Sequence, residues 1–302
     1  MTEPAREPPR LEFLLGSADD VRAEAYVRLV GSASAATISG TLVGPRCVIA
    51  TTLPTTIPLR ALAAPGPAAA RAVVTEPSYW TPDLPNLYAL TAEARDAAGI
   101  VAATRRLVGL RRLGVRGRSI WLDGRRWVPR GEIAAADVFD PHEFRTHDLV
   151  AVVDEPPEDV CAAADAAGVA IVARVAGDSA GTIPTLAQHP SVVVTVVDAG
   201  EAAAAAAADG RGTMLLAVEV DGGVPPPAEV PSGIRCLVVR LDANTVPAEV
   251  WRKSAPAVPL VAWRAHGQRG RTACDGLQAD LAGWACAGGR RPGWDWAGYL
   301  VS

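Results

Sequence analysis

Charged side chains follow several apolar runs in the second half of the chain, at spacings that could support chemistry. The residues in question are Arg174, Asp198, Glu219, Asp221, Arg240, Asp242 and Arg264. Glu219 and Asp221, like Arg240 and Asp242, are two positions apart, so on an extended strand each pair lies on one side of a sheet. Paired carboxylates can act as acid, base or nucleophile, and guanidinium groups can hold an anion. The pattern therefore predicts a charged site with one of these two chemistries.

The elements that must position these residues are strands that alternate with short helices. Strands are expected at 127–132, 149–154, 170–175, 192–198, 213–220, 234–242, 259–264 and 295–301, and helices at 158–167, 183–188, 201–208, 247–254 and 275–286. Near-continuous apolar strands between helices are typical of a parallel sheet covered on its outer face. Eight of them predict a compact (β/α)8 barrel of the TIM type over residues 111–302, with its functional groups at the C-terminal strand ends.

The first part of the chain has a different sequence pattern. Strand-length runs, several of them alternating apolar with polar residues, occupy 11–15, 21–30, 37–43, 46–53, 70–76, 87–94 and 100–108. Gly, Pro, Asp or Ser separates most of them, as in antiparallel sheets. We therefore expect an N-terminal immunoglobulin-like antiparallel β-sandwich over residues 1–110.

Composition excludes several classes of protein. The chain has 302 residues, 49% of them hydrophobic and 21% charged, with a net charge of -4, so it is not a disordered or strongly basic chain. We expect no nucleic-acid partner, no membrane partner and no cofactor. The N-terminus lacks a signal-peptide pattern, and five scattered cysteines and four dispersed histidines indicate neither a disulfide framework nor a metal site. The expected location is the cytoplasm.

Four segments carry a resemblance to a known family. They are PSYWTPDLPNLY from Pro77 to Tyr88, GLRRLGVRGRSIWLDGRRWVPRG from Gly109 to Gly131, His189-Pro190-Ser191 with the apolar strand behind it, and Trp294-Asp295-Trp296. In type, spacing and order they resemble the family-two glycoside hydrolases, the group of β-galactosidases, β-glucuronidases and β-mannosidases. The resemblance implies a sandwich followed by a barrel, without the family's N-terminal jelly roll.

The family's catalytic positions are replaced in this chain. Retaining hydrolysis needs two carboxyl groups about 5–5.5 Å apart, which the family takes from the ends of barrel strands four and seven. Ala199-Gly200 stands at the strand-four position, and the strand-seven run from Pro259 to His266 offers no carboxylate. Other sugar-contacting positions of the family correspond to Ile133, Ala135, Val150, Val153 and Ala173-Arg174. The resemblance therefore implies the scaffold without the family's mechanism.

Two interpretations of Asp198 and Glu201 stay open. They can replace the missing acid and base, or they can begin the Ala-rich helix, because acids are favoured at N-caps and in first turns. We favour the helix start. His189 is expected to pack or hydrogen-bond within its turn.

The charged strand ends and the two tryptophans also have two interpretations. Arginines and acids around the barrel mouth can form a salt-bridge network that closes it, or a remodelled polar pocket that binds a ligand. Trp294 and Trp296 lie on one side of the last expected strand, where they can pack in the core or stack on a sugar. The candidate ligand-binding residues are Arg174, Glu219, Arg240, Asp242, Arg264, Trp294 and Trp296.

Three functions are compatible with these patterns. The favoured one is a pseudoenzyme with a binding, scaffolding or regulatory role linked to carbohydrate. The second is a divergent hydrolase of β-glycosides with relocated carboxylates from Asp198, Glu201, Glu219 or Asp242. The third is a barrel that binds a small anionic ligand through its arginines.

Overall fold

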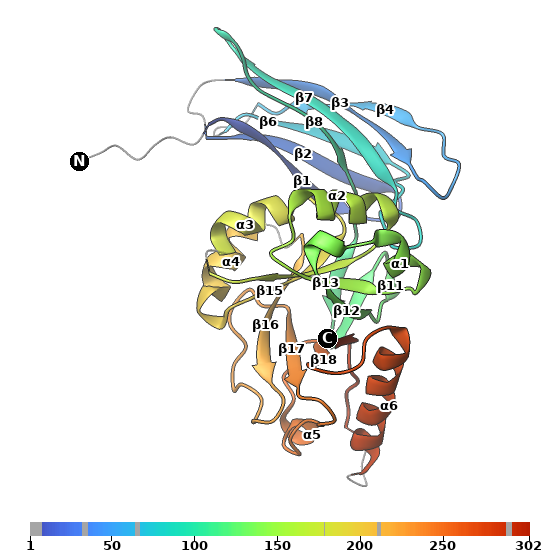
Figure 1. Ribbon diagram of the computed structural model, residues 1–302. Coiled ribbons are helices and arrows are strands. Elements are labelled where there is room, and N and C mark those ends of the chain that lie inside the picture. The colour runs from blue at the N-terminus through green and yellow to red at the C-terminus, as the bar shows by residue number, and fades with distance from the viewer. Residues whose placement is uncertain (1–7, 32–35, 64–66, 178, 210–212, 288–291) are drawn as a thin grey trace, which may run out of the picture. The chain divides into compact units, whose positions relative to one another are not determined.

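The computed structural model describes residues 8–31, 36–63, 67–177, 179–209, 213–287 and 292–302. The chain forms two compact units that divide after Arg112 (Figure 1). Each unit has a hydrophobic core of its own. Among the described helices, none has both the length and the apolar character needed to cross a lipid bilayer.

The first unit consists of two antiparallel sheets that share one core. One sheet has the order β1-β2-β6-β5, from strands Arg10–Ala18, Arg22–Val30, Ala69–Thr75 and Arg60–Ala61. The other has the order β4-β3-β7-β8, from Thr55–Pro58, Thr37–Arg46, Leu87–Asp96 and Gly99–Val108. β2 and β6 bury every second residue, as the alternation predicted, and residues from both sheets, such as Val27 and Leu90, belong to one core.

The strand predicted at 46–53 is wrong. β3 ends at Arg46 and β4 begins at Thr55, and the segment between them exposes Val48 by 73% and Leu53 by 89%. Its β-branched residues suggested a strand. Strand propensity, however, reflects packing against neighbours, and no described strand pairs with residues 47–53.

A small antiparallel sheet precedes the barrel and was not predicted. It has the order β11-β10-β9, from Arg125–Arg126, Ser119–Leu122 and Leu113–Arg116. Gly117 lies at a φ of 57° in the turn between β9 and β10, a conformation that glycine adopts without strain. The Arg116 guanidinium lies 4.4 Å from the centroid of the Trp121 ring across this hairpin.

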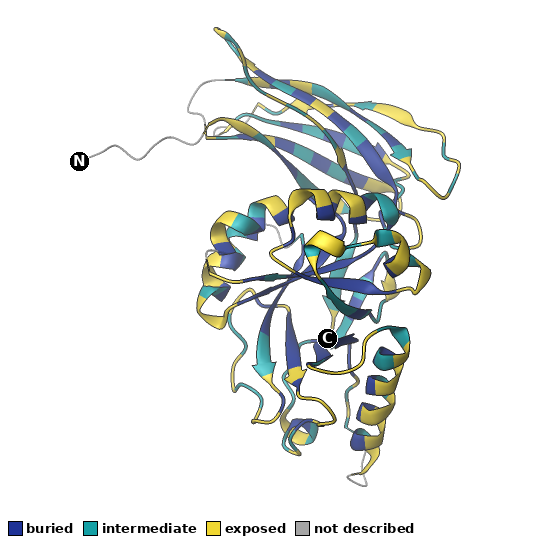
Figure 2. Cartoon of the chain, in the orientation of Figure 1, coloured by how far each residue is buried: buried dark blue, intermediate teal, exposed yellow. Residues whose placement is uncertain are grey.

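The second unit contains the predicted closed, eight-stranded parallel barrel (Figure 1). Its strands in order are β12 (Arg130–Ala134), β13 (Val150–Asp154), β14 (Ile171–Val175), β15 (Val192–Val197), β16 (Leu215–Asp221), β17 (Cys236–Leu241), β18 (Leu260–Arg264) and β19 (Gly298–Val301). Most are short runs of Val, Leu and Ile buried on both faces (Figure 2), as expected of a barrel whose outer face is covered by helices. β12 pairs with β19 and closes the ring.

Helices cover the outside of the barrel. They are α1 (Pro141–Thr146), α2 (Glu158–Ala167), α3 (Ser179–Leu186), α4 (Ala202–Asp209), α5 (Trp251–Ser254) and α6 (Arg271–Ala287), with short 3-10 turns η1 (Ala136–Val138) and η2 (Ala199–Glu201). α2 has the predicted bounds because Pro157 precedes it and Gly168 ends it at a φ of 77°, with its N–H donating to the Ala164 carbonyl. α1 was not predicted.

The register of the strands decides which side chains face the barrel interior. β14 pairs Arg174 with Val196 of β15, and β17 pairs Arg240 with Trp263 of β18. The alternate residues of these strands, such as Ala173 and Val239, belong to the core that packs against the helices. Arg174, Arg240 and Trp263 therefore point inward, at the C-terminal end of the barrel.

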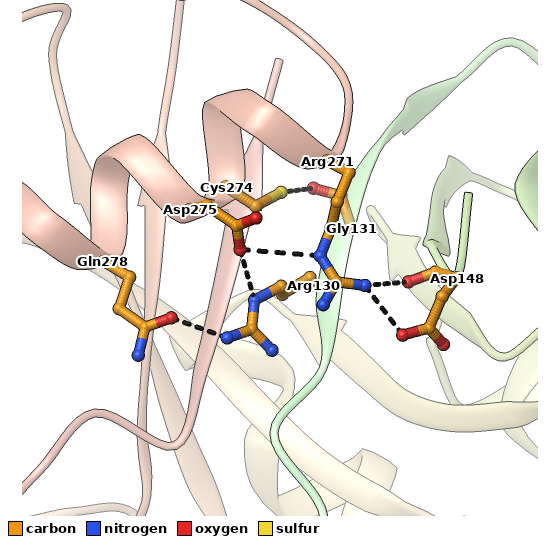
Figure 3. A network of polar contacts seen from close by, with 7 residues as sticks. All are labelled: Arg130, Gly131, Asp148, Arg271, Cys274, Asp275 and Gln278. Atoms are coloured by element: carbon orange, nitrogen blue, oxygen red, sulfur yellow. Dashed lines mark hydrogen bonds and ion pairs between the residues drawn. The ribbon is translucent and has the colours of Figure 1, made fainter.

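A polar network fastens α6 to the first barrel strands (Figure 3). Asp275 accepts a hydrogen bond of 2.8 Å from Arg130 and lies 3.5 Å from Arg271, which in turn donates to Asp148 over 2.7 Å. Cys274 donates to the Gly131 carbonyl at 3.4 Å. Gly131 lets β12 and β13 approach closely, since a Cβ there would lie 2.5 Å from the Val150 carbonyl oxygen.

Candidate functional site

The candidate site is a pocket of about 610 Å³ at the C-terminal ends of β13 to β17. Its polar lining consists of Asp154, Glu155, Arg174, Asp198, Glu219, Asp221 and Arg240. Its apolar lining consists of Val175, Ala176, Val196, Val197 and Val220. This is the end of a barrel at which functional groups of TIM barrels lie. The mouth is therefore an open pocket with a charged wall.

Glu219 lies between two guanidinium groups. Its Oε1 is 3.6 Å from Nη1 of Arg240, and its Oε2 is 3.9 Å from Nη2 of Arg174. Each oxygen of the carboxylate thus faces one arginine. Both distances are those of ion pairs rather than of short hydrogen bonds.

Arg174 is held from three sides. Its Nη1 donates to Asp154 over 2.8 Å, its guanidinium carbon lies 4.4 Å from the centroid of the Trp263 ring, and Glu219 faces its Nη2. Stacking on an aromatic ring and pairing with carboxylates suit the planar guanidinium group. Together with Arg240 and Asp242, which are 4.0 Å apart, these contacts form a row of alternating charges from Asp154 to Asp242.

Acids outnumber bases in this pocket. Its lining contains five carboxylates and two guanidinium groups. Two of the carboxylates also accept backbone hydrogen bonds, Glu155 from Ala176 at 2.7 Å and Asp221 from Gly223 at 2.7 Å. The surplus negative charge opposes the binding of an anion and favours an uncharged or cationic ligand.

Asp198 and Glu201 separate in the structure. Asp198 lines the pocket, at the N-cap position of η2, where its carbonyl accepts the Glu201 N–H over 2.9 Å. The two acids therefore begin the helical segment, as favoured, although the Asp198 side chain makes no cap hydrogen bond. Glu201 ends η2 just before α4 and does not line the pocket.

Asp242 and Arg264 are not part of the pocket wall. Asp242 follows β17, its carboxylate lies 4.0 Å from Arg240, and its backbone carbonyl accepts hydrogen bonds from Thr245. Arg264 pairs in register with Leu241, on the outer face of the sheet, and its Nη1 donates to Asp280 of α6 over 2.7 Å. The prediction that Arg264 binds a ligand at the mouth is corrected, because strand alternation turns Trp263 inward and Arg264 outward.

Trp294 and Trp296 also lie away from the mouth. β19 begins only at Gly298, so both tryptophans precede the strand and lie at the N-terminal end of the barrel. They line a separate pocket with Val128 and Arg130, next to the start of β12. Sugar stacking at the mouth is therefore excluded for both.

A buried polar cluster lies at the N-terminal end of β15, and only its His189 was singled out from the sequence. His189 Nδ1 lies 2.7 Å from Oδ2 of Asp165, and Asp165 Oδ1 accepts the Ser191 N–H over 2.8 Å. All three residues are buried. His189 was expected to pack or hydrogen-bond within its turn, but its side chain pairs with Asp165 of α2 instead. The single acid in the Ala-rich run of α2 could have pointed to this partner.

The positions that correspond to the family's catalytic residues carry no carboxylate, although Asp198 comes directly after β15. Ala199-Gly200 follows β15, the fourth barrel strand, and Ala265-His266 follows β18, the seventh. Within the described ranges, no group of three or more His, Cys, Asp or Glu residues has the arrangement to hold a metal ion.

Comparison with known proteins finds solved structures with a similar fold. No family model and no curated protein matches the sequence. Among solved structures, a β-glucuronidase from Ruminococcus gnavus in complex with uronic deoxynojirimycin superposes with a TM-score of 0.68 at 12% identity, over 97% of this chain and 61% of that chain. A β-glycosidase from Bacteroides vulgatus gives 0.62 at 12% identity, over 86% and 39% of the two chains. A putative β-galactosidase from Bacteroides fragilis gives 0.58 at 12% identity, over 85% and 48%.

These likenesses concern the fold. The architecture of antiparallel sheets followed by an eight-stranded barrel is that of the β-glucuronidases and β-galactosidases, which confirms the resemblance to the family-two glycoside hydrolases at the level of the fold. The chain spans between 39% and 61% of the length of the three structures described above.

Proposed function

We propose that this chain is a glycosidase-like pseudoenzyme that binds an uncharged carbohydrate at the mouth of its barrel without cleaving it. The observation that carries the proposal is the position of Glu219, whose two oxygens face Arg174 and Arg240. Retaining hydrolysis requires two carboxyl groups that are free to act as acid and nucleophile. A carboxylate engaged by two arginines, together with strand ends that carry Ala199-Gly200 and Ala265-His266, favours binding over cleavage.

The pocket suits a sugar of neutral charge. Carboxylate oxygens accept hydrogen bonds from hydroxyl groups, and Asp198 and Asp221 line the pocket with exposed side chains. The apolar lining from Val175 to Val220 offers contact to the C–H faces of a pyranose ring. A small anionic ligand is disfavoured by the surplus of acids, which leaves the arginines as structural partners of Glu219.

A scaffolding or regulatory role is compatible with such a module. We interpret the first unit as an immunoglobulin-like sandwich. In support, the Tyr88 hydroxyl near the start of β7 accepts the Ser78 N–H over 3.0 Å, a contact resembling the tyrosine corner of such domains. The five free cysteines support a reducing, cytoplasmic location.

One observation favours a second function. Asp198 and Glu219 line the same pocket, as a divergent hydrolase with relocated carboxylates would require. That alternative demands turnover of a β-glycoside, whereas the favoured function demands binding alone.

Binding can be tested by calorimetric titration with methyl glycosides of glucose, galactose and mannose. We expect saturable binding of at least one glycoside, weakened by Asp198→Ala because a hydrogen-bond acceptor is lost from the pocket. Glu229→Ala is the matched control, since Glu229 is an exposed acid outside the pocket lining. No saturable binding of any neutral glycoside, or equal losses in both variants, would contradict the proposal.

A further inference from the structure

A second concave region lies at the N-terminal end of the barrel, away from the mouth. It consists of one pocket of about 290 Å³ and another of about 600 Å³. The two pockets share the lining residues Arg126, Pro292, Trp294 and Asp295, so they form one continuous groove. We call it the N-terminal groove. It lies between the small sheet β9–β11 and the segment that leads into β19.

One wall of the N-terminal groove is aromatic. Trp294 and Trp296 meet edge to face, with centroids 5.3 Å apart, and Trp284 of α6 lies 6.3 Å from Trp294. Trp296 is buried, whereas Trp294 is only partly buried and lines both pockets. Because two neighbouring indoles hold its ring, Trp294 presents a fixed apolar surface to a ligand.

Buried donors on this wall lack acceptors. The indole Nε1 atoms of Trp294 and Trp296 are shielded from solvent and make no hydrogen bond within the part of the chain that the structure describes. An unpaired buried N–H group is costly. A bound acceptor would satisfy them.

The charged lining of the N-terminal groove is basic. Arg118, Arg126 and Arg130 face it, against Asp295. Arg118 donates to the carbonyl oxygens of Ala255 and Pro256, which leave its charge uncompensated. Arg130 is anchored by Asp275 and Gln278 (Figure 3), at 2.8 and 2.6 Å.

Arg126 is the arginine best placed for a ligand. It lies on β11, is exposed, and makes no ion pair or side-chain hydrogen bond with any residue of the described ranges. A guanidinium group beside an aromatic face is suited to a ring that carries a negatively charged substituent.

We propose that the N-terminal groove is a second binding site, for a sugar that carries a carboxylate or a phosphate. The pyranose ring stacks on Trp294, and the anionic group pairs with Arg126. This site is the electrostatic opposite of the acidic pocket at the mouth. It shares no lining residue with that pocket and does not depend on the function proposed for it.

The test is calorimetric titration with glucose 6-phosphate and glucuronate. Glucose, which supplies the ring alone, and inorganic phosphate, which supplies the anion alone, serve as half-ligands for comparison. We expect both anionic sugars to bind at least tenfold more tightly than either half-ligand. Arg126→Gln should weaken binding about tenfold or more, as the loss of a charged hydrogen bond implies, while Arg125→Gln on the same strand leaves it unchanged. Trp294→Ala should abolish binding, and Trp294→Phe should retain it, which separates stacking from a loss of folding.

Three outcomes would overturn the proposal. One is inorganic phosphate binding as tightly as glucose 6-phosphate, since the ring would then contribute nothing. Another is an equal effect of Arg125→Gln and Arg126→Gln. The third is loss of anionic-sugar binding in Glu219→Gln, which would place the ligand at the mouth instead. If neutral glycosides fail to bind, only the function proposed for the barrel mouth is contradicted, and the proposal for the N-terminal groove is not affected.

Discussion

Glu219 on β16 faces Arg240 on the neighbouring strand β17, with 3.6 Å between Oε1 and Nη1. Both side chains point into the barrel, and Arg174 approaches the other oxygen of the same carboxylate. At the mouth of the barrel, the carboxylate of Glu219 is thus shared by the guanidinium groups of Arg174 and Arg240. This arrangement underlies the functional proposal and the first prediction.

Replacing Glu219 by Gln should have a small effect on folding. The three side chains are between 27% and 50% exposed, so solvent screens their attraction. We expect the free energy of unfolding to fall by about 1 kcal/mol or less, and by less still at high salt. Urea unfolding at two salt concentrations measures both effects, with Glu229→Gln as the control. A loss of several kcal/mol that salt does not change would contradict the screened pairing.

Asp165→Ala should be far more disruptive. Asp165 accepts hydrogen bonds at both carboxylate oxygens inside the protein, and its removal leaves His189 and the Ser191 N–H buried without this partner. We expect a loss of about 3–5 kcal/mol in the free energy of unfolding. Glu158→Ala, in the exposed first turn of the same helix, should cost less than about 1 kcal/mol. Similar losses in the two variants would refute a structural role for the cluster.

The five cysteine thiols should fall into a reactive group and a protected group. Burial raises the pKa of Cys161 and Cys236 to about 12, and that of Cys274 to about 11. Because the thiolate is the reactive form, we expect Cys47 and Cys286 to react with a thiol reagent at pH 8 while the other three stay protected. Titration of native against unfolded protein counts the reactive thiols.

The same pKa shifts make the free energy of unfolding depend on pH. The unfolded chain loses these thiol protons near the ordinary pKa of 9.0, whereas the folded chain keeps them to higher pH. The stabilisation is therefore fully present below pH 9 and is lost as the pH rises from 9 towards 12. Rapid modification of all five native thiols, or stability that increases over this range, would be inconsistent with burial.

Gly131→Ala should destabilise the closure of the barrel. An added Cβ would lie 2.5 Å from the Val150 carbonyl oxygen on the neighbouring strand, so the backbone would have to shift. We expect a cost of about 1–3 kcal/mol. Gly114→Ala is the matched control, since nothing lies within 4 Å of its Cβ position. Thermal unfolding of both variants makes the comparison, and equal midpoints would be the contrary result.

The barrel could be predicted from the sequence because its signal is local. Each strand is a short apolar run between turns or helices. Strand alternation also placed Glu219 with Asp221, and Arg240 with Asp242, on one side of the sheet. The same alternation, applied to β18, would have turned Arg264 outward. That residue was misplaced because proximity to a strand end was weighed above side-chain parity.

The remaining errors have other physical causes. The last strand was expected to begin at residue 295 but begins at Gly298. This shift places Trp294 and Trp296 before the strand, at the end of the barrel opposite the mouth. The sheet β9–β11 has strands of two to four residues, too short for a periodic signal. The partnership of Asp165 with His189 joins residues 24 positions apart and depends on tertiary packing.

The most direct test of the central claim is the hydrolysis of a panel of aryl β-glycosides by the wild-type chain, Glu219→Gln and Asp198→Asn. The account predicts that the wild type releases the aryl group no faster than either variant, while it still binds a neutral glycoside. Turnover by the wild type that disappears in either variant, with folding intact, would show that relocated carboxylates catalyse cleavage and would contradict the account.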